Sequence, residues 1–232
     1  MAKTALVTGA SRGIGREVAT ELARDGYRVL LAVRVPHEAP HLEGALVEAL
    51  DVSSRESIDA LAARLRQHGD VLDVLVNNAG INRRPAKETW NVNVRGPLRL
   101  TLALEPLLAD GARVAMVSSG MGRKGVQAPE LNDRLAATRT FGDMERLCDE
   151  APGDYGASKA ALNRLAELFA EELRSRHILV NAVSPGWVRT DMGGPSAPRS
   201  LQQGAASVLW ACRLGKNGPT GGFFEDGEPI RE

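Results

Sequence analysis

A tyrosine and a lysine stand four residues apart in the stretch DYGASKAAL, residues 154–162. Residues at this spacing lie on the same face of a helix, so Tyr155 and Lys159 would face one site. A phenol can deliver a proton to a developing alkoxide, and a neighbouring ammonium would lower the phenol pKa from its usual value of about 10. On its own, the pair also fits a half-exposed helix that carries both residues without any chemistry.

A glycine-rich loop, TGASRGIG at residues 8–15, follows an apolar run and precedes an amphipathic stretch. Gly9 permits a tight turn, Gly13 lets the backbone approach a phosphate, and Gly15 allows close packing of helix on strand. The helix that begins here would point free N–H groups at a pyrophosphate. Its strand-to-helix position favours nucleotide binding over an ordinary glycine turn. The loop residues expected to contact the nucleotide are Gly9, Ser11, Arg12, Gly13, Ile14 and Gly15.

The end of the second apolar run, LLAVRVP, indicates which nucleotide binds. A carboxylate at this position would accept a hydrogen bond from a ribose 2′-hydroxyl and repel a 2′-phosphate. Val33 stands where that acid is expected, and Arg34 follows it. Arg12 can reach the same phosphate, and two guanidiniums around one phosphate favour the phosphorylated cofactor. We therefore expect NADP(H) rather than NAD(H), unless both arginines are ordinary surface residues.

These residues sit among alternating apolar runs and amphipathic stretches, the pattern of β-α units around a parallel sheet. Strands are expected at 3–8, 28–33, 45–50, 72–78, 112–119, 178–185 and 221–226. Helices are expected at 13–24, after the Ser53/Ser54 cap, and at 90–109, 153–176 and 200–213. The link between the second and third strands has room for a loop or a single turn. We expect one Rossmann-type α/β domain over residues 1–232, a doubly wound parallel sheet of about seven strands in the order 3-2-1-4-5-6-7.

The composition argues against several other kinds of protein. The 29 basic and 29 acidic residues balance, which gives no reason to expect nucleic acid or an anionic membrane as a partner. No apolar run approaches the roughly 20 residues of a membrane span. The two cysteines, Cys148 and Cys212, have no paired spacing, which fits a reducing cytoplasm. The four histidines form no ligand pattern, so no metal site is expected.

Six short motifs follow one another along the chain: TGASRGIG, NNAG at 77–80, NVNVRG at 91–96, VSS at 117–119, YGASK at 155–159 and PGWVRT at 185–190. In this order they resemble the short-chain dehydrogenases/reductases over nearly the whole chain, and the monomeric carbonyl-reductase branch in particular. The resemblance implies that Tyr155 is the general acid and base, with Lys159 tuning its pKa and holding the nicotinamide ribose. It implies that Ser119 orients the substrate carbonyl, with Ser118 as the competing candidate, and that Asn93 holds a water of a proton relay.

The same resemblance implies further cofactor contacts beyond the carboxyl ends of the strands. Asp51 would contact the adenine, although it could instead cap the helix that follows. The NNAG backbone would approach the adenine ribose, unless it mainly braces the sheet, and the Val188 backbone would hold the carboxamide. Outside the glycine loop, the expected cofactor contacts are Arg34, Asp51, Val52, Asn77, Ala79, Gly80, Tyr155, Lys159, Pro185, Gly186, Val188 and Thr190.

Two spacings depart from the family pattern. Gly80 and Asn93 are only 13 residues apart, so the loop beside the substrate entrance and the first turns of the following helix must be cut back. Ser119 and Tyr155 are 36 residues apart, which leaves an insertion at about 121–152 with enough apolar residues for one or two short helices. An insertion packed in cis would cover the helix faces through which family members associate. A monomer is therefore expected, the alternative being an insertion that folds outward as a lid.

The combined pattern predicts an NADPH-dependent carbonyl reductase, an alcohol dehydrogenase in reverse, acting on a ketone, aldehyde or quinone. Nucleotide-sugar epimerases and dehydratases share the tyrosine–lysine pair, but they are longer chains with a substrate domain for which 232 residues leave no room. A redox-sensing protein that binds NADP(H) without turnover remains the alternative. Such proteins tend to lose a catalytic residue, whereas all four are present here.

Overall fold

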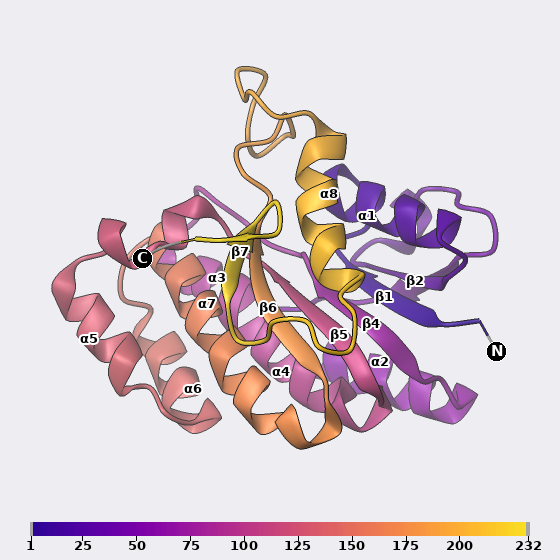
Figure 1. Ribbon diagram of the computed structural model, residues 1–232, viewed down its shortest axis with the longest axis horizontal. Coiled ribbons are helices and arrows are strands. Elements are labelled where there is room, and N and C mark those ends of the chain that lie inside the picture. Colours follow the sequence, from indigo (N-terminus) through magenta and orange to yellow (C-terminus); the bar gives the residue numbers. More distant parts are fainter. Residues whose placement is uncertain (1, 231–232) are drawn as a thin grey trace.

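Eight strands form one sheet at the centre of the molecule, in the order β3-β2-β1-β4-β5-β6-β7-β8 (Figure 1). The structure is a computed structural model that describes residues 2–230. The strands are β1 (Thr4–Thr8), β2 (Arg28–Val33), β3 (Leu46–Ala49), β4 (Leu72–Asn77), β5 (Leu108–Val117), β6 (Leu179–Ser184), β7 (Phe223–Glu225) and β8 (Glu228–Pro229). The first seven strands run parallel, and β8 pairs antiparallel with β7. The doubly wound Rossmann-type order is confirmed, with one strand more than expected.

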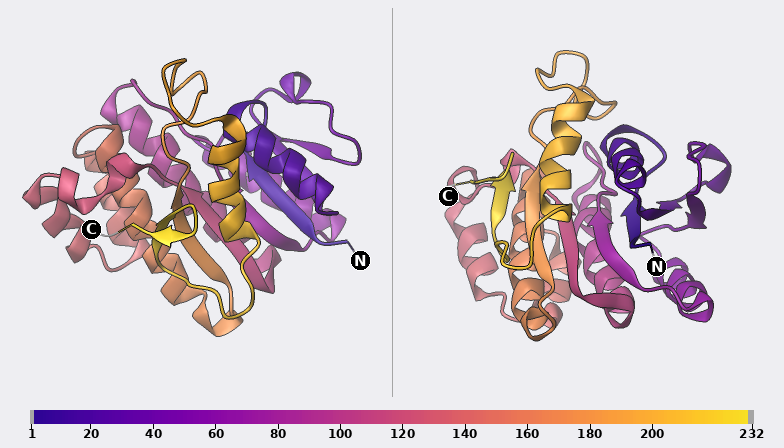
Figure 2. Two further views of the ribbon diagram at one scale, coloured as in Figure 1. Left: turned by 45° about the horizontal axis from the view of Figure 1, so that its top comes forward. Right: turned by 45° about the vertical axis from the view of Figure 1, so that its right-hand side comes forward.

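Helices cover both faces of this sheet (Figures 1 and 2). On one face lie α1 (Gly13–Arg24) and α8 (Leu201–Cys212), in contact with each other. On the other face lie α2 (Arg55–His68), α4 (Gly96–Leu104) and α7 (Tyr155–Glu172). Alternate residues of a strand point to opposite faces, so Leu6 of β1 belongs to the core under α2, α4 and α7, while Ala5 and Val7 belong to the core under α1 and α8. Burial on both faces explains why these strands are continuous apolar runs.

The link between β2 and β3 contains only a single turn, Pro36–Glu38, as the sequence indicated. β3 is an edge strand, and its first two residues, Leu46 and Val47, are 48% and 43% exposed.

The chain between β4 and β5 differs most from the expected single helix at 90–109. It forms α3 (Ala86–Trp90), a π-helical turn (Asn91–Arg95) and then α4, and β5 already begins at Leu108. Pro97 has no N–H to donate to the Asn93 carbonyl four residues earlier, and a missing donor of this kind is a common cause of a widened turn. The helical region thus starts earlier than expected, its last α-helix ends at Leu104, and a single 3-10 turn, Glu105–Leu107, leads into β5.

The strand β8 was not foreseen, although its signal is present in the sequence. Asp226 and Gly227 join it to β7 with φ angles of 53° and 84°. Two consecutive residues with positive φ form the tight hairpin turn for which Asp-Gly is a favoured pair.

The insertion before α7 forms two helices that pack on the body of the protein. They are α5 (Pro129–Ala137) and α6 (Phe141–Glu150), and both lie against α7 (Figure 1). Leu131, Leu135, Met144 and Leu147 all join the larger core, and the rings of Phe141 and Phe169 have centroids 4.5 Å apart. The two helices of the insertion therefore pack in cis, against the body of the protein.

This cis packing predicts a monomer in solution. The insertion covers part of the helical surface around α7 and α4, and one apolar face cannot be buried twice. Light scattering after gel filtration at micromolar concentration should give a mass near 24.8 kDa. A mass of twice that value or more would contradict the prediction.

Candidate active site

A cavity of about 1480 Å³ lies beyond the carboxyl ends of the parallel strands. Open α/β sheets bind their ligands at this edge. Most of the site residues expected from the sequence lie in its wall: Gly9, Ser11, Arg12, Gly13, Ile14, Arg34, Asp51, Val52, Ala79, Gly80, Ser119, Tyr155, Lys159, Pro185, Gly186, Val188 and Thr190. The other three expected residues, Gly15, Asn77 and Asn93, lie behind the wall.

The glycine loop joins β1 to α1 at one end of the cavity. Gly9 and Gly13 have positive φ angles of 64° and 58°, which favour glycine. A side chain at Gly15 would come within 2.5 Å of the Gly9 carbonyl oxygen, so Gly15 permits close packing within the loop. The N–H groups of the first helical turn have no partner inside the helix, and two residues of that turn, Gly13 and Ile14, line the cavity.

The two asparagines after β4 take different positions. Asn77 is buried and donates to the Thr101 hydroxyl (3.1 Å), so it braces β4 against α4 and does not reach the cavity. Asn78, which the sequence analysis did not select, lines the cavity. Its side chain donates to the Thr8 carbonyl (2.8 Å), while the Thr8 hydroxyl accepts from the backbone N–H groups of Asn78 and Ala79 (2.9 Å each). These bonds hold the ends of β1 and β4 together.

The end of β2 carries the residues expected to select the nucleotide. Val33 is buried, whereas Arg34 is exposed and lines the cavity. Glu38, on the turn that follows, also lines it and was not anticipated. Arg12 forms a 3.0 Å ion pair with Asp191 in which both side chains are at least 75% exposed. Exposed pairs contribute little free energy, so this pair holds Arg12 only weakly.

Asp51 lies in the wall after β3 but is not the cap of α2. Its Oδ1 accepts hydrogen bonds from the backbone N–H and the hydroxyl of Ser53 (2.9 and 2.6 Å). Ser54 caps the helix, because its hydroxyl oxygen accepts from the Ser57 N–H (3.1 Å). Ser54, and not Asp51, is therefore the N-cap of α2.

Three residues expected to do chemistry meet in one part of the wall. Tyr155 is the first residue of α7 and lies close enough to Ser119, which follows β5, for this serine to lower the tyrosine pKa. Lys159 lies one helical turn further along, with its Nζ 5.5 Å from the centroid of the Tyr155 ring. This ammonium is buried and donates to the Val117 carbonyl oxygen at 2.8 Å. Helix α7 and the end of β5 thus bring a phenol, a hydroxyl and an ammonium together.

Burial shifts the pKa values of two of these groups. It raises the pKa of Tyr155 above 10, and the hydrogen bond with Ser119 lowers it in part. It lowers the pKa of Lys159 from 10.5 to about 8. The shift of Tyr155 is opposite to the one expected from the sequence, because loss of hydration outweighs the lowering by Ser119. A raised pKa keeps the phenol protonated near neutral pH, which is the form that donates a proton.

The structure distinguishes the two serines that follow β5. Ser118 also lines the cavity, but its hydroxyl donates to Asn163 Oδ1 (2.5 Å) and lies 3.3 Å from the Lys159 carbonyl oxygen, so it is already engaged with other groups of the protein. The Ser119 hydroxyl instead accepts from the Met121 N–H (3.3 Å) and pairs with the tyrosine. This arrangement favours Ser119 as the group that meets a substrate carbonyl.

Asn93 sits in the π-helical turn and is fully buried. Its side chain accepts from the Ile81 N–H (2.9 Å) and donates to the Ile81 carbonyl (3.0 Å) and to the Ser158 hydroxyl (3.0 Å). A side chain on Gly80 would lie 3.3 Å from Asn93 Oδ1 and 3.6 Å from Lys159 Nζ. Asn93 therefore fixes the shortened loop beside the lysine, and its role in a proton relay stays a prediction.

An apolar rim lies at the mouth of the cavity. It consists of Met121, Val126, Trp187 and Met192, whose side chains are 52%, 65%, 57% and 43% exposed. Exposed apolar side chains that gather around a cavity mark a binding surface. Sequence analysis did not select these residues, because all four lie in irregular segments or single 3-10 turns that no apolar periodicity describes.

The described residues, 2–230, hold no candidate metal cluster and no candidate membrane span. No group of three or more His, Cys, Asp or Glu side chains there could hold a metal ion. No helix in this range is both long and apolar enough to cross a membrane. Both cysteines are buried, and burial raises the pKa of Cys148 and of Cys212 to about 12, so neither thiol is reactive near neutral pH.

Comparison with known proteins assigns the family. Residues 3–129 match the family called short chain dehydrogenase, which is more than half of the chain. The chain belongs to the short-chain dehydrogenase family. A second match, over residues 140–221, is to the family called enoyl-(acyl carrier protein) reductase.

Individual relatives of this short-chain dehydrogenase are similar over nearly their whole length. Carbonyl reductase [NADPH] 1 of Sus scrofa is 33% identical over 266 positions, which cover 97% of this chain and 92% of the relative. The Homo sapiens protein of the same name is 31% identical, with 96% and 95% covered. The first alignment is longer than this chain, so the relative carries segments that this chain lacks.

Solved structures give the same fold. Salutaridine reductase from Papaver somniferum superposes with a TM-score of 0.85 at 26% identity, covering 97% of this chain and 99% of that one. Carbonyl reductase Sniffer of D. melanogaster gives a TM-score of 0.79 at 24% identity, with 99% of each chain covered.

Proposed function

We propose that this short-chain dehydrogenase is an NADPH-dependent carbonyl reductase in which Tyr155 donates the proton. The observation that carries the proposal is the meeting of Ser119, Tyr155 and Lys159 in the wall of a cavity that begins at the glycine loop. The full-length relatives named as NADPH carbonyl reductases support it. The buried, unpaired cysteines further suit a protein of the reducing cytoplasm.

The cavity fits a phosphorylated dinucleotide. Its volume of about 1480 Å³ exceeds that of a usual small-molecule pocket, leaving room for a dinucleotide and a substrate. The Lys159 ammonium has three N–H donors but makes one hydrogen bond within residues 2–230, to the Val117 carbonyl. Buried donors require partners, and ribose hydroxyls would supply them. Arg34 would pair with a 2′-phosphate at the opposite end.

In the proposed reaction, the residues of the chain deliver one proton, from the Tyr155 hydroxyl to the oxygen of the substrate carbonyl. NADPH, when bound, supplies the hydride. The Ser119 hydroxyl lies beside the Tyr155 hydroxyl, so a carbonyl oxygen between them accepts a hydrogen bond from the serine and then the proton from the tyrosine. The Lys159 ammonium stabilises the phenolate that remains, because charges attract strongly where water is excluded.

A redox-sensing protein that binds NADP(H) without turnover is the competing function. Purified protein should be mixed with NADPH and a panel of ketones, aldehydes and quinones while NADPH absorbance is followed. Steady loss of absorbance with at least one carbonyl supports a reductase. Tight NADPH binding with no turnover across the panel would favour the sensor.

Replacing Arg34 with aspartate should change the cofactor preference. The variant loses a phosphate partner and gains a repulsive charge, so we expect its Kd for NADPH to rise at least about tenfold more than its Kd for NADH, which is about 1.4 kcal/mol of discrimination. Arg174→Asp is the matched control, because Arg174 is exposed and lies outside the cavity wall. A wild type that already prefers NADH would contradict the assignment of Arg34.

A further inference from the structure

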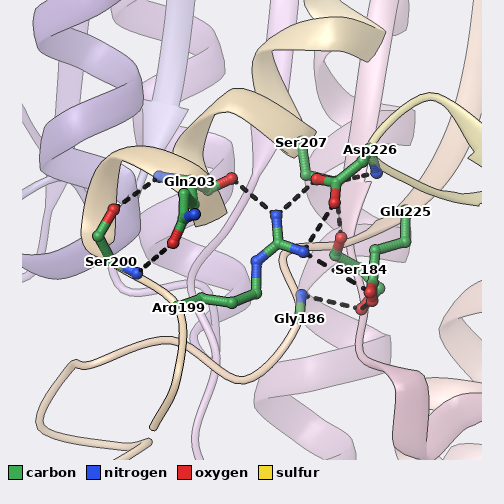
Figure 3. A network of polar contacts seen from close by, with 8 residues as sticks. All are labelled: Ser184, Gly186, Arg199, Ser200, Gln203, Ser207, Glu225 and Asp226. Atoms are coloured by element: carbon green, nitrogen blue, oxygen red, sulfur yellow. Dashed lines mark hydrogen bonds and ion pairs between the residues drawn. The ribbon is translucent and has the colours of Figure 1, made fainter.

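An arginine outside the catalytic group joins the end of the cavity loop to the last hairpin of the chain (Figure 3). Arg199 makes a two-pronged ion pair with the Asp226 carboxylate, at 2.7 and 2.5 Å. It also donates to the Gln203 carbonyl oxygen (3.0 Å) and lies 3.7 Å from Glu225. Only 20% of its side chain is exposed. Paired bonds of this kind fix both distance and orientation.

The rest of Arg199 lies against the cavity wall. A side chain on Gly186 would come within 2.4 Å of Arg199 Cδ, so the arginine stem passes directly over this glycine. Its backbone N–H donates to the Trp187 carbonyl (3.2 Å), and its carbonyl accepts from the Arg189 N–H (3.0 Å). Arg199 Nε, which faces Gly186, has no partner within residues 2–230, so one hydrogen bond is given up for this close approach.

A second set of bonds connects the hairpin to the same stretch of wall (Figure 3). The buried Ser184 hydroxyl donates to the Glu225 carboxylate (2.6 Å) and accepts from the Gly186 N–H (3.1 Å). The buried Ser207 hydroxyl donates to the Ser184 carbonyl (2.7 Å) and accepts from the Asp226 N–H (2.9 Å). The hairpin residues Glu225 and Asp226 are thus joined to the cavity wall both through Arg199 and through the two serines. Arg199 is the cation that faces both carboxylates.

We propose that Arg199 is a positioning residue that holds the backbone of Gly186–Val188 in place for the nicotinamide half of the cofactor. This inference rests on the proposed function and on the expectation that the Val188 backbone holds the nicotinamide carboxamide. Without the guanidinium, Asp226 and Glu225 would face each other with no cation between them, and the stem over Gly186 would be lost. Within residues 2–230, no hydrogen bond or ion pair joins Arg34 or the glycine loop to Arg199, Glu225 or Asp226. The glycine loop reaches the neighbouring stretch of the wall through the exposed Arg12–Asp191 pair.

The test compares a whole cofactor with its adenine half. Calorimetry would give the Kd of NADPH and of adenosine 2′,5′-bisphosphate, which lacks the nicotinamide, for the wild type and for Arg199→Met. We expect the variant to bind NADPH about tenfold more weakly, a loss of about 1.4 kcal/mol, and the bisphosphate as the wild type does. Displacement of the nicotinamide should also lower kcat by about 10²-fold.

Two further variants separate positioning from general stability. Arg213→Met removes an arginine that pairs with Asp25 (2.7 Å) at the other end of α8, and it should leave both Kd values unchanged. Asp226→Asn keeps a residue that tolerates positive φ while weakening the ion pair, and it should show a smaller selective loss of NADPH affinity. It also provides the test if Arg199→Met does not fold.

The possible results of these binding measurements distinguish a failure of the positioning role from a failure of the proposed function. Equal weakening of both ligands, or no weakening of either, in folded Arg199→Met would overturn the positioning role and leave the proposed function intact. A wild type that binds neither ligand would overturn the proposed function and this inference with it. Selective loss of NADPH affinity, partly restored in Arg199→Lys, would support the inference.

Discussion

Replacing Tyr155 with phenylalanine is expected to lower kcat/KM for carbonyl reduction by about 10²–10⁴-fold, the usual loss when a general acid is removed. Only the hydroxyl and its hydrogen bond with Ser119 disappear, because the ring and its contact with Lys159 remain. NADPH affinity should therefore stay close to that of the wild type. Steady-state kinetics and a titration of NADPH would measure the two effects separately.

The other tyrosine of the chain provides the matched control. Tyr27 lies just before β2 and outside the cavity wall, and burial raises its pKa as it does for Tyr155. The same loss of a hydroxyl in Tyr27→Phe should leave turnover unchanged. If Tyr155→Phe turned over like the wild type, the tyrosine would have no part in proton transfer.

The placement of the site could be predicted because it depends on topology. Parallel strands end at one edge of a sheet, so the residues after β1, β2, β4, β5 and β6 meet there whatever the loop shapes. The glycine loop and Arg34 follow two of these strands, and both line the cavity. The spacing of Tyr155 and Lys159 needed only one helical turn.

The choice between neighbouring residues could not be predicted in the same way. Asn77 and Asn78 are adjacent at the end of β4, where successive side chains point to opposite faces. Both faces of this sheet are buried, so its strands are apolar at every position and show no alternation. The sequence pattern therefore does not indicate which asparagine side chain points toward the cavity. The contact that decides it is between Asn78 and Thr8, which are 70 residues apart.

Two other departures, the π-helical turn and strand β8, have local signals in the sequence. Pro97 removes a helical donor beside the π-helical turn, and the pair Asp226-Gly227 predicts a hairpin. The apolar rim had no such signal. Its residue Trp187 is held by a bond from its ring N–H to the Gly193 carbonyl (2.8 Å) within an irregular loop, and no periodicity describes that path.

Replacing Lys159 with methionine is expected to lower the rate of carbonyl reduction and to abolish the fall of kcat/KM near pH 8. Burial lowers the pKa of this lysine to about 8, so in the wild type kcat/KM for reduction should fall as pH rises through that value and the ammonium is lost. The methionine variant has no charge to stabilise the phenolate, and we expect a loss of about 10²–10³-fold, the usual cost of removing one such group. Its Kd for NADPH should rise as well, because the donors for the ribose are gone.

Stability measurements separate lost chemistry from a lost fold in this variant. A lysine whose folded pKa lies below its usual value of 10.5 destabilises the protein while it is charged, which holds below about pH 8. Methionine matches its length without that charge, so near neutral pH the variant should unfold at a temperature no lower than the wild type. Lys216→Met, at an exposed position, should leave rate and pH profile unchanged. If Lys159→Met retained the fall near pH 8, another group would titrate there, and the phenolate would have to be stabilised without the lysine.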